Sequence, residues 1–286
     1  MLLTIFTPTY NREHLLPRLY HSLLEQTCRD FCWLIVDDGS LDHTRELVEQ
    51  WQHEGNLKIT YIYQSNGGKM RAHNTGVRHA DTELFLCVDS DDYLSKTAVD
   101  VVIEKWCREK DDNKSGIVAH KGKSENELLS GMPFPLSGSS TLYGLYLHGF
   151  QGETTLVFRT KILKENLFPE IEGEKYVPED YIYDKIDRNY QLLILPEILT
   201  ICEIVEAGYT ANVRKLREDN PHAWYLYYKQ RAEITPFSIL KLKYVSYYWI
   251  YAGFVSEKIF KNTELSSVMI LAGLPGALVL KILNKR

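Results

Sequence analysis

Two acidic segments in the first hundred residues have the residue types and spacing to hold a metal ion and a nucleotide. Asp89-Ser90-Asp91 sets two carboxylates one residue apart. Mg²⁺ and Mn²⁺ accept such a pair when substrate phosphates complete the coordination shell, whereas the alternative is a helix N-terminus whose acidic residues offset the helix dipole. In Asp37-Asp38-Gly39-Ser40, a carboxylate can accept hydrogen bonds from a base or ribose, or it can simply build a turn.

A glycine-containing loop and a later acidic pair complete the candidate chemistry. Asn66-Gly67-Gly68-Lys69 is a permissive loop that leads into a helix start with a cation. Such a loop suits a diphosphate, although a plain turn is the alternative and the segment does not match the Walker pattern. Glu179-Asp180 falls at a predicted helix start after Pro178. This pair either complements the helix dipole or supplies a general base that deprotonates an acceptor hydroxyl.

Alternating strands and helices are predicted to position these segments. Short apolar runs that end in polar or glycine-rich residues predict strands at 2–6, 32–36, 57–63 and 83–88. Helices are predicted from residue 12 with Asn11 as the cap, from Asp42 to about 52, over 69–79 and over 95–109. This alternation predicts a mainly parallel sheet with helices on both faces. The polar segments should then meet at the carboxyl ends of the strands, where ligands bind in such sheets.

The remainder of the chain divides by composition. Residues 110–140 are polar and punctuated by Gly, Ser and Pro, so we expect loops there, followed by a strand at 154–158 and a helix at about 178–190. From 214 to 286 the chain holds 12 basic against 5 acidic residues, which leaves 21 against 33 in 1–213 and gives the overall net charge of −5. That balance argues against nucleic-acid binding, which needs a basic footprint. Five scattered cysteines and a start without a secretory signal predict a cytoplasmic protein.

Taken together, these segments resemble the family 2 glycosyltransferases of the GT-A fold. The resemblance rests on Thr7-Pro8-Thr9-Tyr10-Asn11-Arg12, Val36-Asp37-Asp38-Gly39-Ser40, Asn66-Gly67-Gly68-Lys69 with Ala72, Asn74 and Gly76, and Asp89-Ser90-Asp91-Asp92. It implies a metal-dependent, inverting transferase that uses a nucleotide-sugar donor. The segment Ala72-His73-Asn74 departs from the Ala-Arg-Asn common in the family, which puts one phosphate or base contact in doubt.

The resemblance also assigns residues to parts of the donor. Thr7, Pro8 and Tyr10 would cradle the nucleobase and ribose, and Asp38 would accept a hydrogen bond from the uracil N3–H. Lys69 would lie near the diphosphate and Asp89 near the ribose, while Asp91 would hold the Mn²⁺ or Mg²⁺ that bridges the phosphates. The expected nucleotide-sugar-binding set is completed by Arg12, Gly68, Asn74 and Ser90.

The family's general base lies in an acidic motif at a helix start in the second half of the chain. Here that position is Asp180, with Glu179 as the main alternative and Asp184 as a weaker third. The implied reaction is a metal-assisted single displacement with inversion, from a UDP-sugar to a glycan or lipid-linked glycan acceptor in bacterial surface polysaccharide synthesis. The alternatives are a sugar nucleotidyltransferase of similar fold and a non-catalytic nucleotide-binding or membrane scaffold protein.

The C-terminal part is predicted to be a helical extension, 214–286, of a GT-A catalytic domain, 1–213. Within that domain, 1–109 would be the nucleotide-binding half and 110–213 the acceptor half. The apolar run at 268–280 would span only about 20 Å as a helix, short of a bilayer core. Lysines interleaved with aromatic residues favour peripheral contact of 241–286 with the inner face of the membrane. A helical hairpin packed on the catalytic domain or on a second subunit is the alternative.

Overall fold

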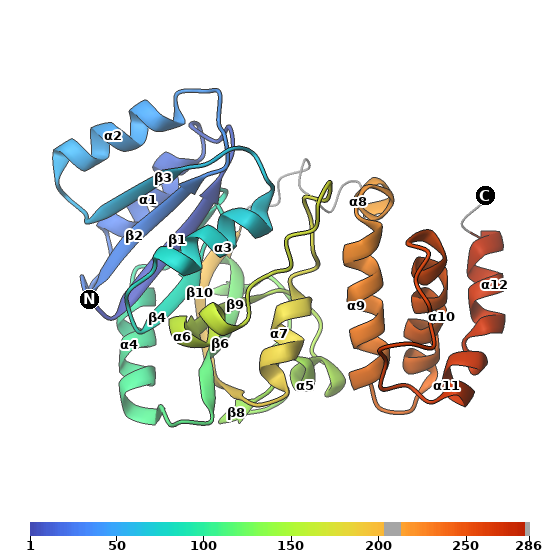
Figure 1. The fold of residues 1–286 in the computed structure, drawn as a ribbon. Coiled ribbons are helices and arrows are strands. Elements are labelled where there is room, and N and C mark those ends of the chain that lie inside the picture. The colour runs from blue at the N-terminus through green and yellow to red at the C-terminus, as the bar shows by residue number, and fades with distance from the viewer. Residues whose placement is uncertain (203–212, 284–286) are drawn as a thin grey trace. The chain divides into compact units, whose positions relative to one another are not determined.

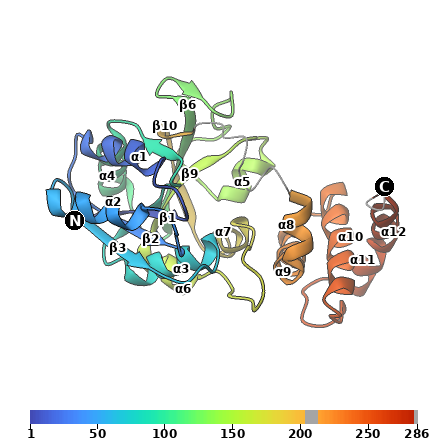
Figure 2. The ribbon, with the colours of Figure 1, turned by 90° about the horizontal axis from the view of Figure 1, so that it is seen from above.

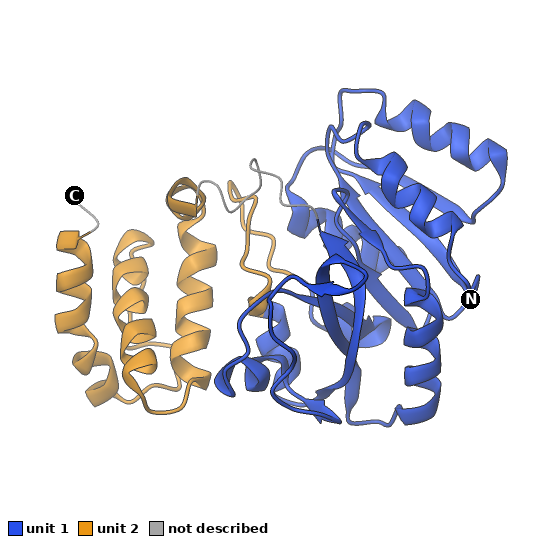
Figure 3. Ribbon diagram, turned by 180° about the vertical axis from the view of Figure 1, so that it is seen from behind, with its two compact units in different colours: residues 1–167, 182–205 blue, residues 168–181, 206–286 orange. Residues whose placement is uncertain are grey.

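The computed structural model describes residues 1–202 and 213–283. The chain forms two compact units, which Figure 3 shows in different colours. Unit 1 comprises residues 1–167 with 182–205, and unit 2 comprises residues 168–181 with 206–286.

The first half of unit 1 alternates between strands and helices, as predicted. Its elements are β1 (Leu3–Thr9), α1 (Leu16–Leu24), β2 (Phe31–Asp37), α2 (Thr44–Glu54), β3 (Ile59–Tyr63), α3 (Lys69–His79), β4 (Leu84–Cys87), β5 (Asp92–Leu94) and α4 (Ala98–Glu109) (Figure 1). The leucines at helical spacing in α1 explain its formation, because Leu16, Leu19 and Leu23 are all completely buried. The short strand β5 was not predicted.

The second half of unit 1 contains more strand than the sequence indicates. Its elements are β6 (Lys114–Ser124), β7 (Glu127–Leu128), β8 (Ser139–Ser140), α5 (Leu142–Leu147), β9 (Thr154–Arg159), α6 (Thr160–Glu165), α7 (Asp180–Asp187, whose first two residues belong to unit 2) and β10 (Gln191–Cys202). The prediction of loops over 110–140 is therefore wrong for β6. Gly116, which is typical of loops in a sequence, lies within this strand because a Cβ there would lie 1.8 Å from the Val157 carbonyl oxygen, so that close strand packing requires glycine.

The strands form one mixed sheet in the order β3-β2-β1-β4-β9-β6-β10-β5. The first four strands are mutually parallel, as expected, with Thr9 opposite Asp37 and Phe6 opposite Cys87. Strand β9 then runs antiparallel to both β4 and β6, while β6 and β10 are parallel. The carboxyl ends of β1, β2, β3 and β4 consequently lie at one edge, so the loops that follow them can build a common site.

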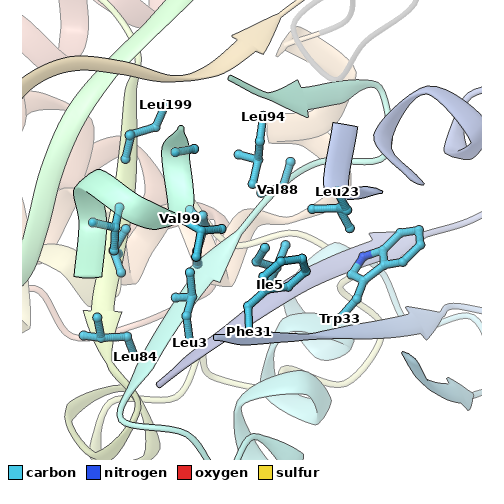
Figure 4. Packing of buried hydrophobic residues seen from close by; sticks show 14 of the residues in the cluster. Leu3, Ile5, Leu23, Phe31, Trp33, Leu84, Val88, Leu94, Val99 and Leu199 are labelled. Carbon is cyan, nitrogen blue, oxygen red and sulfur yellow. The ribbon is translucent and has the colours of Figure 1, made fainter. Parts of the chain in front are cut away.

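Helices cover both faces of this sheet. Figure 2 shows α1 and α4 on one side of the strands and α3 and α6 on the other. A core of large apolar side chains fills the first side, with Leu3, Trp33 and Val99 among those labelled in Figure 4. On the other side, the Phe6 ring stacks on Phe85 with 5.1 Å between centroids. These two packed layers fix the strand ends from which the polar loops extend.

Two predicted boundaries near the first loop are wrong. The first strand was predicted to end at residue 6, but β1 continues through Thr9 because its ladder with β2 continues to that residue. Helix α1 begins at Leu16 rather than at residue 12. Asn11 does not cap this helix; it has a left-handed φ of 53°, and its side-chain carbonyl accepts a hydrogen bond from the Leu41 amide at 2.8 Å.

Unit 2 is helical in its described C-terminal part, as predicted. Its helices are α8 (Val213–Asp219), α9 (Pro221–Ile234), α10 (Ile239–Phe254), α11 (Ser267–Ala272) and α12 (Leu274–Leu283). Aromatic residues form its core, in which Tyr228 stacks on Tyr247 at 4.6 Å and the Tyr248 hydroxyl donates to the Ile259 carbonyl at 3.0 Å. Among the helices of the described residues, none combines the length and apolar character that a membrane crossing needs.

Candidate functional site

The loop after β2 is built around two buried carboxylates with different partners. Asp37, the last residue of β2, accepts hydrogen bonds from the Ser40 amide at 2.7 Å and from the Tyr61 hydroxyl at 2.6 Å. It thus closes the turn that contains Gly39. The Ser40 hydroxyl in turn accepts from the Asn11 amide at 2.8 Å, which ties this loop to the loop after β1.

Asp38 joins the loop after β2 to the loop after β3. Its Oδ1 accepts from the Gln64 amide group at 2.7 Å and from the Gly67 backbone N–H at 2.9 Å. Its Oδ2 accepts from Asn66 Nδ2 at 3.1 Å and from the Gly68 backbone N–H at 2.7 Å. Both carboxylate oxygens are therefore engaged within the chain, and a uracil N3–H would have to share or replace one of these donors. The expected nucleobase contact stays a prediction.

The residues expected to cradle the base lie on and directly after β1. Thr7 and Pro8 are buried in the strand, and the Thr7 hydroxyl accepts from the Trp33 indole N–H at 3.0 Å. Tyr10 is exposed, and Arg12 is half-buried. The buried Thr9 hydroxyl makes no hydrogen bond within the described residues.

Helix α3 begins at the glycine loop and presents a cation at its first residue. Gly68 precedes the helix with a φ of 92°, a conformation that favours glycine. Lys69 Nζ lies 2.8 Å from Asp89 Oδ1 and 2.9 Å from Asp89 Oδ2. Although burial raises the pKa of Asp89, the ammonium groups of Lys69 and Lys121 outweigh it and hold that pKa below its ordinary value. Asn74, further along α3, is completely buried.

The acidic motif after β4 contains three carboxylates, of which two are ion-paired. Asp89 pairs with Lys69, and Asp92 Oδ2 lies 3.2 Å from Lys121 Nζ. Ser90, between them, is buried. Within the described residues, the half-buried Asp91 carboxylate makes neither an ion pair nor a hydrogen bond. Asp91 is therefore the carboxylate of this motif that is available for a new partner.

These residues fit a divalent cation whose coordination shell is largely supplied by substrate. The described residues contain no cluster of three or more His, Cys, Asp or Glu side chains that would enclose a metal ion. A single available carboxylate is compatible with Mg²⁺ or Mn²⁺ sites that use one or two protein carboxylates together with substrate phosphates.

The candidate base lies in unit 2, at the first residue of α7. Asp180 Oδ2 accepts from Arg231 Nη2 of helix α9 at 2.8 Å. Burial and the neighbouring Glu179 raise the pKa of Asp180 above its ordinary value, whereas Arg231 lowers it. The Arg231 side chain is only 6% exposed, whereas 43% of the Asp180 side chain is exposed. Asp184, the weaker candidate, is buried and belongs to unit 1.

The structure brings several of the expected residues into direct contact. Asp38 bonds Gly68, and Lys69 pairs with Asp89, so the loops after β2, β3 and β4 form one connected group in unit 1. Glu179 and Asp180 belong to unit 2. Gln64, Lys121 and Arg231 could not be identified from the sequence, because each lies outside the motifs and meets its carboxylate partner only through the fold.

The mixed sheet and its flanking helices define a GT-A glycosyltransferase fold. The crystal structure of Staphylococcus aureus TarS 1–349 in complex with UDP-GlcNAc matches with a TM-score of 0.67 and 20% identity, over 96% of this chain and 80% of that one. A mannosyltransferase from Pyrobaculum calidifontis, solved with GDP-Man and Mn²⁺, matches with a TM-score of 0.57 and 18% identity, over 97% of this chain and 80% of that one.

The model of glycosyl transferase family 2 matches residues 4–167, which is more than half of the chain, and the chain belongs to this family. The poly(ribitol-phosphate) beta-N-acetylglucosaminyltransferase TarS of S. aureus is 30% identical over 184 residues, which are 59% of this chain. The uncharacterized glycosyltransferase EpsJ of Bacillus subtilis is 33% identical over 117 residues, which are 41% of this chain. The chain covers 30% of the length of TarS and 33% of that of EpsJ.

Proposed function

We propose that this chain transfers one sugar from a UDP-sugar to a glycan or lipid-linked glycan acceptor during bacterial surface polysaccharide synthesis. Family membership supports the transferase class. The names of relatives support the setting, since they include a poly(ribitol-phosphate) beta-N-acetylglucosaminyltransferase and a teichoic acid poly(glycerol phosphate) polymerase. UDP is favoured because TarS has been solved with UDP and with UDP-GlcNAc.

The observation that supports the proposal most directly is that the three carboxylates of the acidic motif have different partners. Two of its carboxylates are neutralised by lysines, while the Asp91 carboxylate, which follows β4, has no partner among the described residues. In the proposal, Asp91 holds Mn²⁺ or Mg²⁺. A bound divalent cation would neutralise the negative charge that develops on the departing diphosphate. The buried Thr9 hydroxyl, which has no hydrogen-bond partner in the described part of the chain, is a further polar group in unit 1 that a bound nucleotide can satisfy.

The proposed reaction is a single displacement. The acceptor oxygen forms a bond to the anomeric carbon while the bond from that carbon to the β-phosphate oxygen breaks, and UDP leaves with the bonding electrons. Asp180 takes the proton of the acceptor hydroxyl on a carboxylate oxygen, with Glu179 as the alternative base. Lys69 supplies positive charge toward the diphosphate once the nucleotide competes for its pairing with Asp89. Attack from the face opposite the leaving group inverts the anomeric configuration.

Calorimetric titration tests the proposal directly. UDP, GDP and dTDP are titrated into the wild-type protein and into Asp91→Asn, each with and without Mn²⁺. We expect UDP to bind the wild type and Mn²⁺ to tighten that binding. Asp91→Asn should keep its metal-free UDP affinity and lose the tightening. Absence of nucleotide binding in the wild type under all conditions would contradict the proposed function.

We also propose that 1–213 acts as the catalytic domain and that the extension 214–286 contacts the cytoplasmic face of the membrane. The structure changes which residues would make this contact. Tyr248 and Tyr251 of α10 are among the aromatic residues of the stretch 241–286 expected to contact the membrane, but they are buried in the core of unit 2. Lys285 and Arg286 lie outside the described residues.

Helices α11 and α12 present an exposed apolar face of unit 2. Helix α12 packs against α10 through small residues. A Cβ at Gly276 would lie 2.3 Å from Ser246 Oγ of α10, and Ala277 is buried. Six large apolar side chains elsewhere on α11 and α12 are 54–78% exposed; they are Val268, Leu271, Leu278, Val279, Ile282 and Leu283. We name these six residues the α11–α12 face. Its apolar character and the net charge of +7 in 214–286 favour an anionic lipid surface as its partner.

A further inference from the structure

The acidic turn that contains Asp91 is held at three points, two of which involve residues outside the sequence motifs. Within the turn, the Asp92 amide donates to the Asp89 carbonyl at 3.0 Å. From α1, the Arg18 guanidinium donates to the Asp91 backbone carbonyl. From β6, Lys121 Nζ lies 3.2 Å from Asp92 Oδ2. Arg18 thus holds the Asp91 backbone and Lys121 holds the neighbouring Asp92 side chain, while the Asp91 carboxylate has no partner among the described residues.

Strand pairing explains how a residue 30 positions away reaches the turn. Asp92 begins β5, which pairs with β10 so that Asp92 lies opposite Cys202. Lys121 lies on β6, which pairs with the other edge of β10 so that Lys121 lies opposite Thr200. The contact therefore depends on the order β6-β10-β5 in the sheet. No local pattern in the sequence could indicate it.

The Lys121–Asp92 pair is more than a surface contact. Its side chains are 16% and 8% exposed, so solvent screens the attraction weakly and loss of one charge would leave the other uncompensated. Lys121 also approaches Glu153 Oε2 at 3.3 Å, and the Glu153 side chain is 65% exposed. The Arg18 guanidinium additionally lies over the Tyr93 ring, 4.8 Å from its centroid, which anchors it beside β5.

We propose that Lys121 and Arg18 are positioning residues that preorganise Asp91 to bind the catalytic metal, Lys121 through the Asp92 carboxylate and Arg18 through the Asp91 carbonyl. The inference rests on the proposed function, in which Asp91 holds that metal. Residues that orient a metal ligand without touching the metal commonly change metal affinity by about 10–100-fold when they are replaced.

The test compares Lys121→Met with Lys123→Met, and the readout is binding rather than turnover. Lys123 lies two residues along the same strand and pairs with Glu127 at 2.6 Å, so its replacement removes a matched ion pair away from the turn. The ratio of the UDP dissociation constants without and with Mn²⁺ is measured by calorimetry, and bound Mn²⁺ is counted by electron paramagnetic resonance. We expect Lys121→Met to weaken Mn²⁺ binding by about 10–100-fold and to leave metal-free UDP affinity unchanged. Lys123→Met should change neither.

Three further variants separate positioning from general support of the fold. Lys121→Arg keeps the charge and should restore most of the Mn²⁺ affinity. If Lys121 acts through Asp92, the double variant Lys121→Met/Asp92→Asn should lose no more affinity than Lys121→Met alone. Arg18→Met should weaken Mn²⁺ binding in the same direction, whereas Arg29→Met, which removes an arginine bonded to the Leu23 and Leu24 carbonyls, should not.

The outcomes distinguish this inference from the proposed function. A wild type whose UDP binding responds to Mn²⁺, together with an equal response in Lys121→Met and Arg18→Met, would overturn the positioning role alone. A wild type without any response to Mn²⁺ would overturn both. Loss of metal-free UDP affinity in Lys121→Met would also count against the inference, because it would show that Lys121 supports the whole site rather than the metal turn.

Discussion

The pair of Asp180 and Arg231 determines how the proposed base responds to pH. A base must be deprotonated to accept a proton, so kcat/KM should fall as the pH drops through the pKa of Asp180 in the free enzyme. Burial raises that pKa, and Arg231 lowers it by favouring the charged carboxylate. Arg231→Met should therefore move the acid limb of the pH–rate profile to higher pH, while Arg231→Lys should leave it nearer the wild-type position.

Two control variants test this shift, one on helix α9 near Arg231 and one at Asp180 itself. Lys229→Met on α9 removes a positive charge two residues from Arg231 and should leave the acid limb in place. Asp180→Asn should lower kcat by about 10²–10⁴-fold and abolish the limb. An acid limb that does not move in Arg231→Met, or one that persists in Asp180→Asn, would assign the base to Glu179 or another residue.

At the residue scale, the motifs could be found from the sequence but their partners could not. The spacing of Asp89 and Asp91 indicated a metal motif, yet only the fold shows that Asp89 and Asp92 are paired while Asp91 is available. The same holds for Asp38, whose four donors come from a loop 26–30 residues away. Charge pairing between distant elements is a tertiary property, so local residue patterns carry no signal for it.

At the element scale, helix α3 contains a glycine that is unfavourable for helix formation but is required by the packing of the helix on β1. Alanine normally stabilises a helix by about 1 kcal/mol relative to glycine. At Gly76, however, an added Cβ would lie 2.4 Å from the Phe6 ring of β1. Overpacking of this kind costs about 1–3 kcal/mol. We therefore expect Gly76→Ala to forgo the usual gain and to lower the free energy of unfolding by up to about 2 kcal/mol, as measured by denaturant titration.

Gly253 of α10 provides the matched control for this prediction. The atom nearest to a Cβ built there is Lys281 Nζ, 4.0 Å away, so the site is open. Gly253→Ala should be neutral or stabilise the protein by up to about 1 kcal/mol. The double variant Phe6→Leu/Gly76→Ala should be more stable than expected from the sum of the single changes, because the smaller side chain makes room. A Gly76→Ala variant that is more stable than the wild type by the usual amount of about 1 kcal/mol would contradict the close packing of α3 on β1.

The elements of the first half could be predicted because their apolar runs alternate with clear polar breaks. The bounds of α3 agree at both ends with the prediction, 69–79. Strand β6 could not be predicted, because the glycine and lysines that looked like loop residues serve tertiary purposes. Gly116 permits close approach to Val157, and Lys121 pairs with Asp92. The end of β1 was misplaced for a similar reason, since Pro8 lies within the ladder to β2.

At the scale of the whole molecule, residues 214–286 carry a net charge of +7 whereas residues 1–213 carry −12, and the basic part also holds the α11–α12 face. Transfer of an exposed leucine or isoleucine side chain from water into the membrane contributes about 1.5–3 kcal/mol to the free energy of binding. Each 1.4 kcal/mol corresponds to about a tenfold change in affinity. The variant Leu278→Glu/Ile282→Glu adds two negative charges to the α11–α12 face as well. We expect it to reduce co-sedimentation with phosphatidylglycerol-containing vesicles by about 100-fold in partition constant.

Two comparisons decide whether lipid is the partner of this face. Leu147→Glu, which changes an exposed leucine of α5 in unit 1, should bind vesicles like the wild type. Neutral vesicles should bind the wild type more weakly than anionic vesicles do. This difference should be larger at low salt, because the attraction of the lysine-rich part to anionic lipid is electrostatic. Sedimentation velocity without lipid tests the alternative. If the wild type is a dimer and Leu278→Glu/Ile282→Glu is a monomer, while neither binds vesicles, the α11–α12 face joins two copies of this chain and the membrane proposal is wrong.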